Sequence, residues 1–226
     1  MTTSRVGPLE SQPWPEQLDA HAVTPSGDPC LFGYDVDSDL ARHYRFADIL
    51  YLSVTGELPT ETCSRAFDMA LTMLAPMSSA EYPIHAAALS RICGARPSGV
   101  LSIASAAVAE HAAETFRACS AYLADPALIL PPELEANDET STRAVLRLAG
   151  TLEGMVDVPL LTRRPRRDVA LLAVLWACGL RTEMQIVTVV TLARLVSAMA
   201  ESLGRRPMAF GDYPTVGAPP FVYEGS

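Results

Sequence analysis

The RRPRR run is the only local cluster of charge in this 226-residue chain, and its arginines could do binding chemistry. A guanidinium group matches the geometry of a phosphate, so a phosphate group or an acidic carrier protein could bind here. Such a run is, however, more often a solvated loop. The sequence leaves both interpretations open for Arg163, Arg164, Arg166 and Arg167.

The chain lacks residues and patterns that several reaction types require. All 17 of its basic residues are arginine, so no Schiff-base, pyridoxal phosphate or P-loop lysine can occur. HExxH, CxxC, EF-hand and GxSxG patterns do not occur, and the five cysteines have no metal-binding spacing. A formal net charge of −9 argues against nucleic acid as a partner. We therefore expect no metal, no cofactor and no nucleic acid.

Capping residues and apolar periodicity predict an all-α protein. We expect an extended arm over 1–29, a compact helical domain over 30–204 and an extended tail over 205–226. The longest helix is rich in Ala and Ser, which predicts a central position with close neighbours. The helices are expected over 60 to about 75, 78 to about 93, 97–124, 137 to about 149, 168–178 and 182 to about 203, with an irregular segment over 150–167.

The sequence gives no sign of a signal peptide or a membrane span. Residues 1–17 contain no apolar run. The longest apolar stretch, 169–180, is too short to cross a bilayer and is followed by Arg181 and Glu183. We expect a soluble, cytoplasmic protein without membrane contact.

The opening part of the helical domain carries a recognisable signature. It contains Gly33-Tyr34-Asp35, then Phe46 before an amphipathic run, then Gly56-Glu57-Leu58-Pro59. This arrangement resembles the N-terminal signature of the citrate synthase family, and HAAALSRICGARPSG over 85–99 resembles a later stretch of that family. In size the chain is most similar to citryl-CoA lyase and to the C-terminal module of ATP-citrate lyase. The resemblance implies a compact citrate-synthase-like helical domain with a reduced small domain, and a homodimer.

The same resemblance implies roles for three residues. His111, in His-Ala-Ala-Glu, matches a His that donates a hydrogen bond to a thioester carbonyl, although both glycines of the family motif are alanine here. Asp168 matches the Asp that abstracts the α-proton, and Arg194 matches an Arg that binds a substrate carboxylate. Structural alternatives remain open. His111 could be an interior hydrogen-bonded residue, Asp168 a helix N-cap, and Arg194 half of an internal ion pair, for instance with Asp168.

Two further residues fall near positions where the family carries histidines. Ser78 or Ser79 matches one of them, and Glu153 lies near another in a shortened segment. We include Ser78 and Glu153 as candidate substrate-binding residues. Ser78 has a structural alternative, because Ser78-Ser79-Ala80-Glu81 reads as a helix-capping box.

Three functions agree with these observations. The first is a divergent enzyme that polarises a carbonyl and stabilises an enol or enolate. It would form or break a C–C bond, or close a ring, on a specialised-metabolism substrate. The second is citryl-CoA lyase or synthase activity on an acyl-CoA. The third is a non-catalytic binding or assembly subunit. The expected partner is a small-molecule substrate, with an acyl thioester as one candidate.

Overall fold

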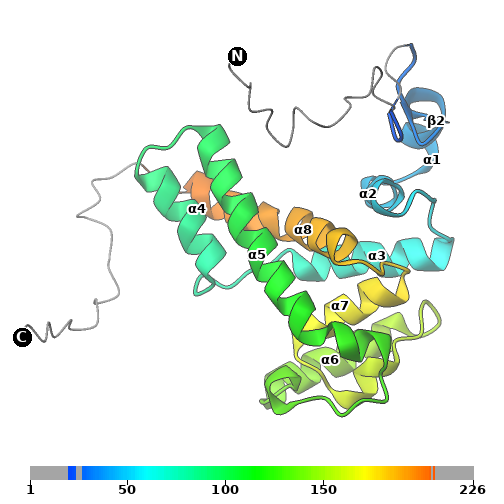
Figure 1. The fold of residues 1–226 in the computed structure, drawn as a ribbon, viewed down its shortest axis with the longest axis vertical. Helices are drawn as coiled ribbons and strands as arrows, with labels where there is room; N and C mark the ends of the chain where they lie inside the picture. Colours follow the sequence, from blue (N-terminus) through cyan, green and yellow to red (C-terminus); the bar gives the residue numbers. More distant parts are fainter. Residues whose placement is uncertain (1–19, 24–26, 205, 207–226) are drawn as a thin grey trace, which may run out of the picture. The chain divides into compact units, whose positions relative to one another are not determined.

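The computed structural model of the protein confirms the all-α prediction (Figure 1). The structure describes residues 20–23, 27–204 and 206, and within them the one sheet is a two-stranded hairpin. Most of the predicted arm over 1–29, and all of the predicted tail over 205–226 except residue 206, lie outside these residues. The chain divides into two compact units, Met1–Arg45 and Phe46–Ser226, which we describe separately.

The first unit holds the Gly-Tyr-Asp part of the signature. Strands β1 (Cys30–Leu31) and β2 (Tyr34–Asp35) pair antiparallel around a two-residue turn. Gly33 has a φ of 84°, a left-handed conformation that glycine adopts without strain. Asp35 accepts a hydrogen bond from the Ser38 backbone N–H and so caps the π-helical turn η1 (Val36–Leu40), which α1 (Ala41–His43) follows.

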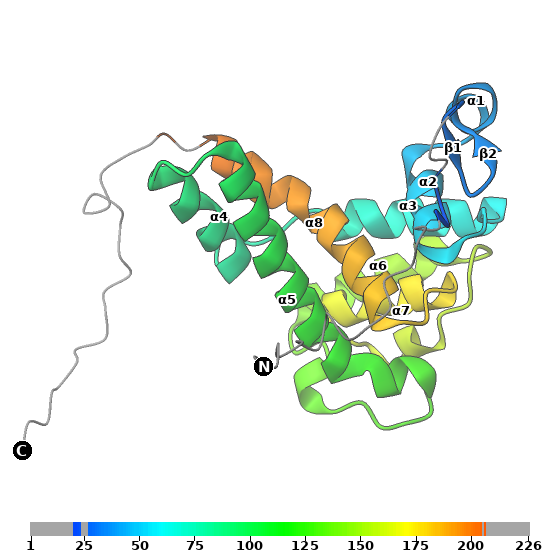
Figure 2. The ribbon, with the colours of Figure 1, turned by 45° about the horizontal axis from the view of Figure 1, so that its top comes forward.

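The second unit is helical throughout (Figures 1 and 2). Gly56, at a φ of 79°, ends its first helix, which explains the glycine of the Gly-Glu-Leu-Pro motif. The elements are α2 (Phe46–Thr55), α3 (Glu61–Leu74), α4 (Tyr82–Ile92), α5 (Pro97–Ala124), η2 (Pro132–Leu134), α6 (Glu139–Leu152), η3 (Pro159–Arg163), α7 (Arg167–Ala177) and α8 (Glu183–Gly204).

Helices α5 and α8 cross each other in the middle of this unit, and α4 packs against both (Figure 2). Ala87 of α4, Ala104 of α5 and Ala198 of α8 are fully buried in one cluster where these helices meet. Their small side chains allow the close approach that the composition of 97–124 predicts. Helix α7 is buried from Val169 to Leu175 and packs against α3, α5 and α6. The start of α7 and the middle of α5 are therefore held in fixed positions by the core.

Three predicted helix starts are wrong, by one to four residues. Helix α6 is capped by Asp138, which accepts from the Ser141 backbone N–H, and not by Asn137. Helix α4 begins at Tyr82. Pro83 is accommodated only in the first turn of a helix, where a backbone N–H has no acceptor within the helix and its absence loses no hydrogen bond. Helix α7 begins at Arg167, so Asp168 lies in its first turn and is not the N-cap. The Thr60 cap of α3 is confirmed by its hydrogen bond from the Cys63 N–H.

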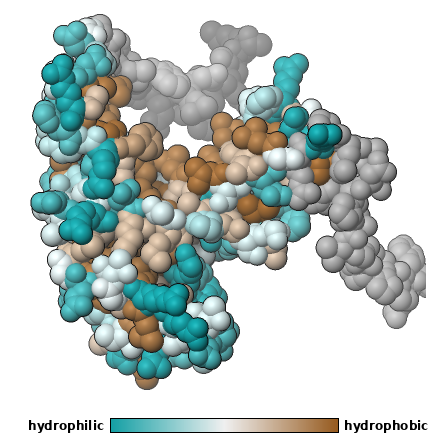
Figure 3. Space-filling model, turned by 180° about the vertical axis from the view of Figure 1, so that it is seen from behind, coloured by the Kyte–Doolittle hydropathy of each residue, from teal (hydrophilic) through white to brown (hydrophobic). Residues whose placement is uncertain are grey.

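Helix α8 keeps a large part of its apolar surface uncovered. By length and composition it could cross a membrane, a test that core helices of soluble proteins also pass. Only 28% of its most apolar window is buried, although it contacts α3, α4 and α5. Leu192, Val196 and Leu203 of α8 are exposed, as are Leu101 and Ile103 of α5. Apolar side chains gather across the middle of the face seen in Figure 3.

Candidate functional site

A pocket of about 810 Å³ brings together residues that are far apart in the sequence. Its walls come from the end of α3, the turn before α4, the middle of α5, the starts of α6 and α7, and the middle of α8. Six of the predicted site residues line it: Ser78, His111, Arg166, Arg167, Asp168 and Arg194. This convergence does not follow from any local pattern, since Ser78 lies in the turn before α4 and Arg194 is on α8.

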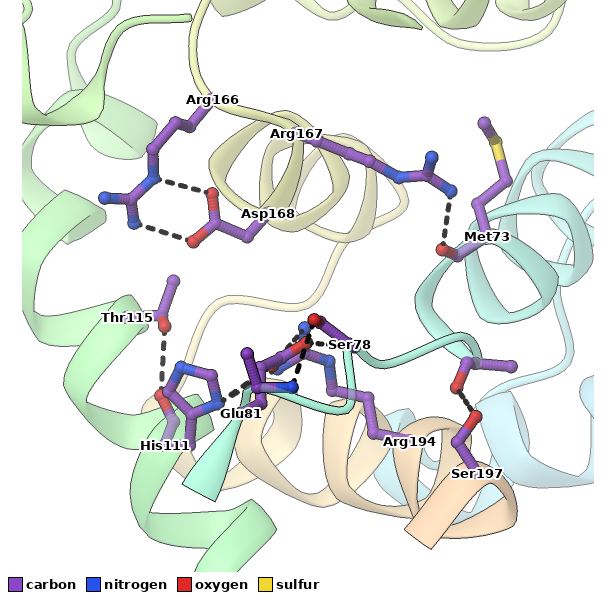
Figure 4. Close-up of polar contacts among 12 residues, drawn as sticks. Met73, Ser78, Glu81, His111, Thr115, Arg166, Arg167, Asp168, Arg194 and Ser197 are labelled. Carbon is purple, nitrogen blue, oxygen red and sulfur yellow. Dashed lines mark hydrogen bonds and ion pairs between the residues drawn. The ribbon is translucent and has the colours of Figure 1, made fainter. Parts of the chain in front are cut away.

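His111, Arg194 and Glu81 form one cluster on the wall of the pocket (Figure 4). Arg194 Nη1 lies 3.2 Å from His111 Nδ1, and Arg194 Nη2 lies 3.2 Å from Glu81 Oε2. Glu81 Oε2 is also 3.5 Å from His111 Nδ1. The three side chains are 13% to 26% exposed, so their charges are partly removed from water. Mutual attraction is stronger there than it would be at an open surface.

The contact with Arg194 decides the hydrogen-bonding roles of the two nitrogens of the His111 ring. A guanidinium group can only donate, so Nδ1 accepts and the proton resides on Nε2. The ring of Tyr82 lies 5.3 Å from the imidazole, centroid to centroid. In Figure 4 the imidazole extends from α5 towards the part of the view that holds Arg166 and Asp168. His111 is thus set up to donate a hydrogen bond from Nε2.

Asp168 is paired with Arg166 and not with Arg194, contrary to the ion pair suggested by the sequence. Arg166 Nε and Nη2 donate to Asp168 Oδ1 and Oδ2 at 3.0 and 2.7 Å. Burial raises the pKa of Asp168, but the hydrogen bonds and charge of Arg166 outweigh this, and the net pKa is lowered. The carboxylate is therefore ionised at neutral pH and is able to accept a proton.

Arg167 is the cation of this pocket without a carboxylate partner in the described part of the chain. Its Nη2 donates to the Met73 carbonyl at 3.1 Å, which draws the side chain from α7 across to the end of α3 (Figure 4). Arg166 and Arg194 are each balanced by a carboxylate. The pocket therefore has one uncompensated positive charge, and an acidic group of a ligand would be attracted to it.

The remaining candidates lie elsewhere. Arg163 and Arg164 are exposed at the end of η3 and do not line the pocket, so the RRPRR run is divided between two environments. Glu153 follows α6 and lines a separate, mainly apolar pocket of about 720 Å³. The structure does not bring these three residues together with His111.

Glu81 is the site residue that the sequence interpretation missed. The predicted capping box is half formed: Glu81 Oε1 accepts from the Ser78 backbone N–H at 2.7 Å, but Ser78 Oγ accepts from Ala80. Glu81 itself is the N-cap residue of α4. The predicted capping box explains the contact of Oε1. The sequence gives no indication that Oε2 faces Arg194.

The pairing of Arg166 with Asp168 leads to a prediction about stability. Asp168 has a lowered pKa in the folded state, so the stability it contributes is present above its unfolded pKa of about 3.9 and is lost as the pH falls through the folded value. Arg166→Gln should cost about 1–2 kcal/mol at pH 7. We expect the difference from the original protein, measured by urea unfolding, to shrink as the pH falls below about 4.

A matched control uses an exposed ion pair. Arg143 pairs with Glu139 on α6, and both side chains are more than half exposed. Arg143→Gln should change the free energy of unfolding by less than about 0.5 kcal/mol at either pH. An equal loss at pH 7 and pH 3 in the Arg166 variant would show that Arg166 does not hold down the pKa of Asp168.

Comparison with known proteins identifies the fold that holds this pocket. The structure is similar to that of citryl-CoA lyase from Hydrogenobacter thermophilus, with a TM-score of 0.59, 18% sequence identity, and coverage of 91% of this chain and 96% of that one. The chain has a citrate-synthase-like fold. No protein-family model and no curated protein matches the sequence. At this level of identity the similarity extends to the fold alone.

The fold also explains the two alanines that replace glycines of the family motif. Ala112 and Ala113 are 2% and 8% exposed, within the unbroken helix α5. Their methyl groups are packed into the protein and do not border the pocket. The backbone at this point of α5 is thus covered by side chains and is closed to a ligand.

Proposed function

We propose that this protein is an enzyme that polarises a carbonyl group and stabilises the resulting enol or enolate. In such a reaction a C–C bond is formed or broken, or a ring is closed, at the carbon next to the carbonyl. The single observation that supports this most is the presence of a His111 donor and the ionised Asp168 on the walls of one pocket. A hydrogen-bond donor and a carboxylate base are the two groups that enolisation requires.

Each group has a defined part in the proposed reaction. His111 donates from Nε2 to the carbonyl oxygen, where negative charge develops as the enolate forms. Asp168 takes the proton from the adjacent carbon, or returns it in the reverse direction. Arg194 fixes the orientation and the tautomer of His111. The pocket residues Ser78 and Arg167 border the space that the substrate would occupy.

An acyl thioester is the first substrate to test, because citryl-CoA lyase is a structural neighbour. We further propose a cytoplasmic homodimer. The exposed apolar residues of α5 and α8 support self-association, since contiguous exposed apolar surface commonly marks an interface. This part of the proposal is independent of the chemistry in the pocket.

The test of the proposed function is hydrogen exchange at the α-carbon of a thioester. The protein is incubated with acetyl-CoA in D₂O, and deuterium in the acetyl group is followed by mass spectrometry. We expect exchange well above the rate without protein, because a transient enolate takes up a deuteron from the solvent in place of the proton that it lost. The exchange assay needs no knowledge of the second substrate. Absence of exchange with acetyl-CoA and with a panel of simple 2-oxo acids would contradict the proposal.

A second candidate, a non-catalytic binding or assembly subunit, is favoured by one observation. Both Asp168 and Arg194 are already ion-paired within the protein, so their charges are satisfied without a ligand. Thermal unfolding separates the two functions when exchange is absent. A ligand specific for the native state raises the unfolding temperature. A shift with a thioester but no exchange would favour the binding subunit.

A further inference from the structure

We propose that Glu81 is a built-in carboxylate that occupies the anion site formed by Arg194, so that an acidic group of the substrate binds at Arg167 instead. The proposal deepens the proposed function, and it rests on that function for the existence of a substrate. It assigns the selectivity of the pocket to one glutamate before α4. The substrates that fit are carbonyl compounds with a single acidic group near the reacting carbon.

The position of Glu81 is the first support. Its Oε2 lies 3.2 Å from Arg194 Nη2, which is where a bound carboxylate would contact this arginine, and 3.5 Å from His111 Nδ1. The other oxygen is held by the Ser78 backbone N–H at 2.7 Å. Glu81 is thus anchored by the turn before α4 and is not a mobile side chain at the edge of the pocket.

Unused donors and acceptors in the cluster are the second support. Glu81 Oε2 and Arg194 Nε are both buried, and neither has a well-aligned hydrogen-bond partner in the described part of the chain. The charges face each other, but the fork of Arg194 is not engaged by two parallel hydrogen bonds. A free carboxylate could adopt the bidentate arrangement with Nε and Nη2 that a guanidinium group prefers. Arg194 therefore retains the capacity of an anion site that Glu81 fills imperfectly.

The charge balance of the pocket is the third support. With Glu81 present, Arg194 is neutralised, and a second carboxylate placed beside it would meet a like charge. Arg167 has no carboxylate partner among the described residues, and its guanidinium group borders the same pocket. A substrate with one acidic group can use Arg167 without penalty. One with two acidic groups must place the second next to Glu81, which discriminates against it.

Binding of malonate, a small dicarboxylate, tests the proposal without any need for turnover. Dissociation constants are measured by calorimetry at low salt for the original protein, Glu81→Ala, Arg194→Ala, Arg167→Ala and the double variant Glu81→Ala with Arg194→Ala. We expect Glu81→Ala to bind malonate about tenfold or more tightly than the original protein, because a charge-assisted bidentate pair becomes available. The double variant should lose this gain. In the original protein Arg167→Ala should weaken binding. Arg194→Ala alone leaves Glu81 without its counter-charge, so the contribution of Arg194 is measured by comparing Glu81→Ala with the double variant.

A matched control removes a glutamate of another arginine pair. Glu139 is exposed on α6 and pairs with Arg143, so Glu139→Ala should leave malonate binding unchanged. If Glu81→Ala does not fold, Glu81→Gln decides the question, because it removes the charge and keeps an acceptor for the Ser78 N–H. Two results would overturn the proposal: no tighter binding in the folded Glu81 variant, or unchanged malonate binding in Arg167→Ala. A failed exchange assay would leave this binding result unaffected.

Discussion

His111→Ala is expected to lower the rate of α-hydrogen exchange by about 10²- to 10³-fold, the usual cost of losing one hydrogen-bond donor to a developing oxyanion. His111 Nδ1 is occupied by Arg194, so Nε2–H is its free donor, and alanine supplies none. The protein should stay folded, because His111 is 26% exposed and its neighbours Ala112 and Phe116 form the core on the other side of α5. Exchange rates are compared at saturating thioester, with circular dichroism to confirm the fold.

Two further variants make this result specific. His85 is an exposed histidine on α4 that does not line the pocket, so His85→Ala should retain the full exchange rate. His111→Gln keeps an amide donor of similar reach and should recover part of the loss. Exchange in His111→Ala within about threefold of the original rate would mean that another group polarises the carbonyl. Equal loss in His111→Ala and His85→Ala would point to a general effect on the protein.

Much of the fold could be predicted because its signals are local. Thr60 and Gly56 mark helix ends through their own backbone and side-chain chemistry, and the small residues of α5 predict its close neighbours. The errors at Ser78 and Asp168 share one cause. A capping pattern identifies a residue able to cap, but a nearby Pro83 or Arg166 can offer a better local arrangement.

The sequence identified part of the pocket lining but missed Glu81 and the pairing of the charged residues. The family resemblance pointed to His111, Asp168 and Arg194, and all three line one pocket. Which carboxylate meets which arginine depends on how α4, α5, α7 and α8 pack. Arg194 is more than a hundred residues from Glu81 along the chain, and no periodicity connects them. Ion pairs between residues far apart in the sequence therefore cannot be predicted from the pattern of one segment. Arg166 and Asp168, in contrast, are only two residues apart.

Asp168→Asn should lower the rate of α-hydrogen exchange by about 10²- to 10⁴-fold, the range that a positioned general base contributes. The amide has the shape of the carboxylate but cannot take the proton. Thioester binding should change little, because Arg167 and the apolar wall of the pocket remain. Arg166 loses its counter-charge in this variant, so some loss of stability is expected and is measured alongside.

The lowered pKa of Asp168 gives this prediction a second, independent test. A carboxylate held below its usual pKa is ionised at neutral pH but is a weak base, so Arg166 limits the rate that Asp168 can reach. Arg166→Gln leaves burial as the dominant influence and should raise that pKa. The acid limb of the pH–rate profile should then move to higher pH.

Asp125→Asn, at an exposed turn after α5, serves as the control and should exchange normally. If Asp168→Asn exchanges at the original rate, Asp168 only orders Arg166, and the base must be sought among the other groups of the pocket.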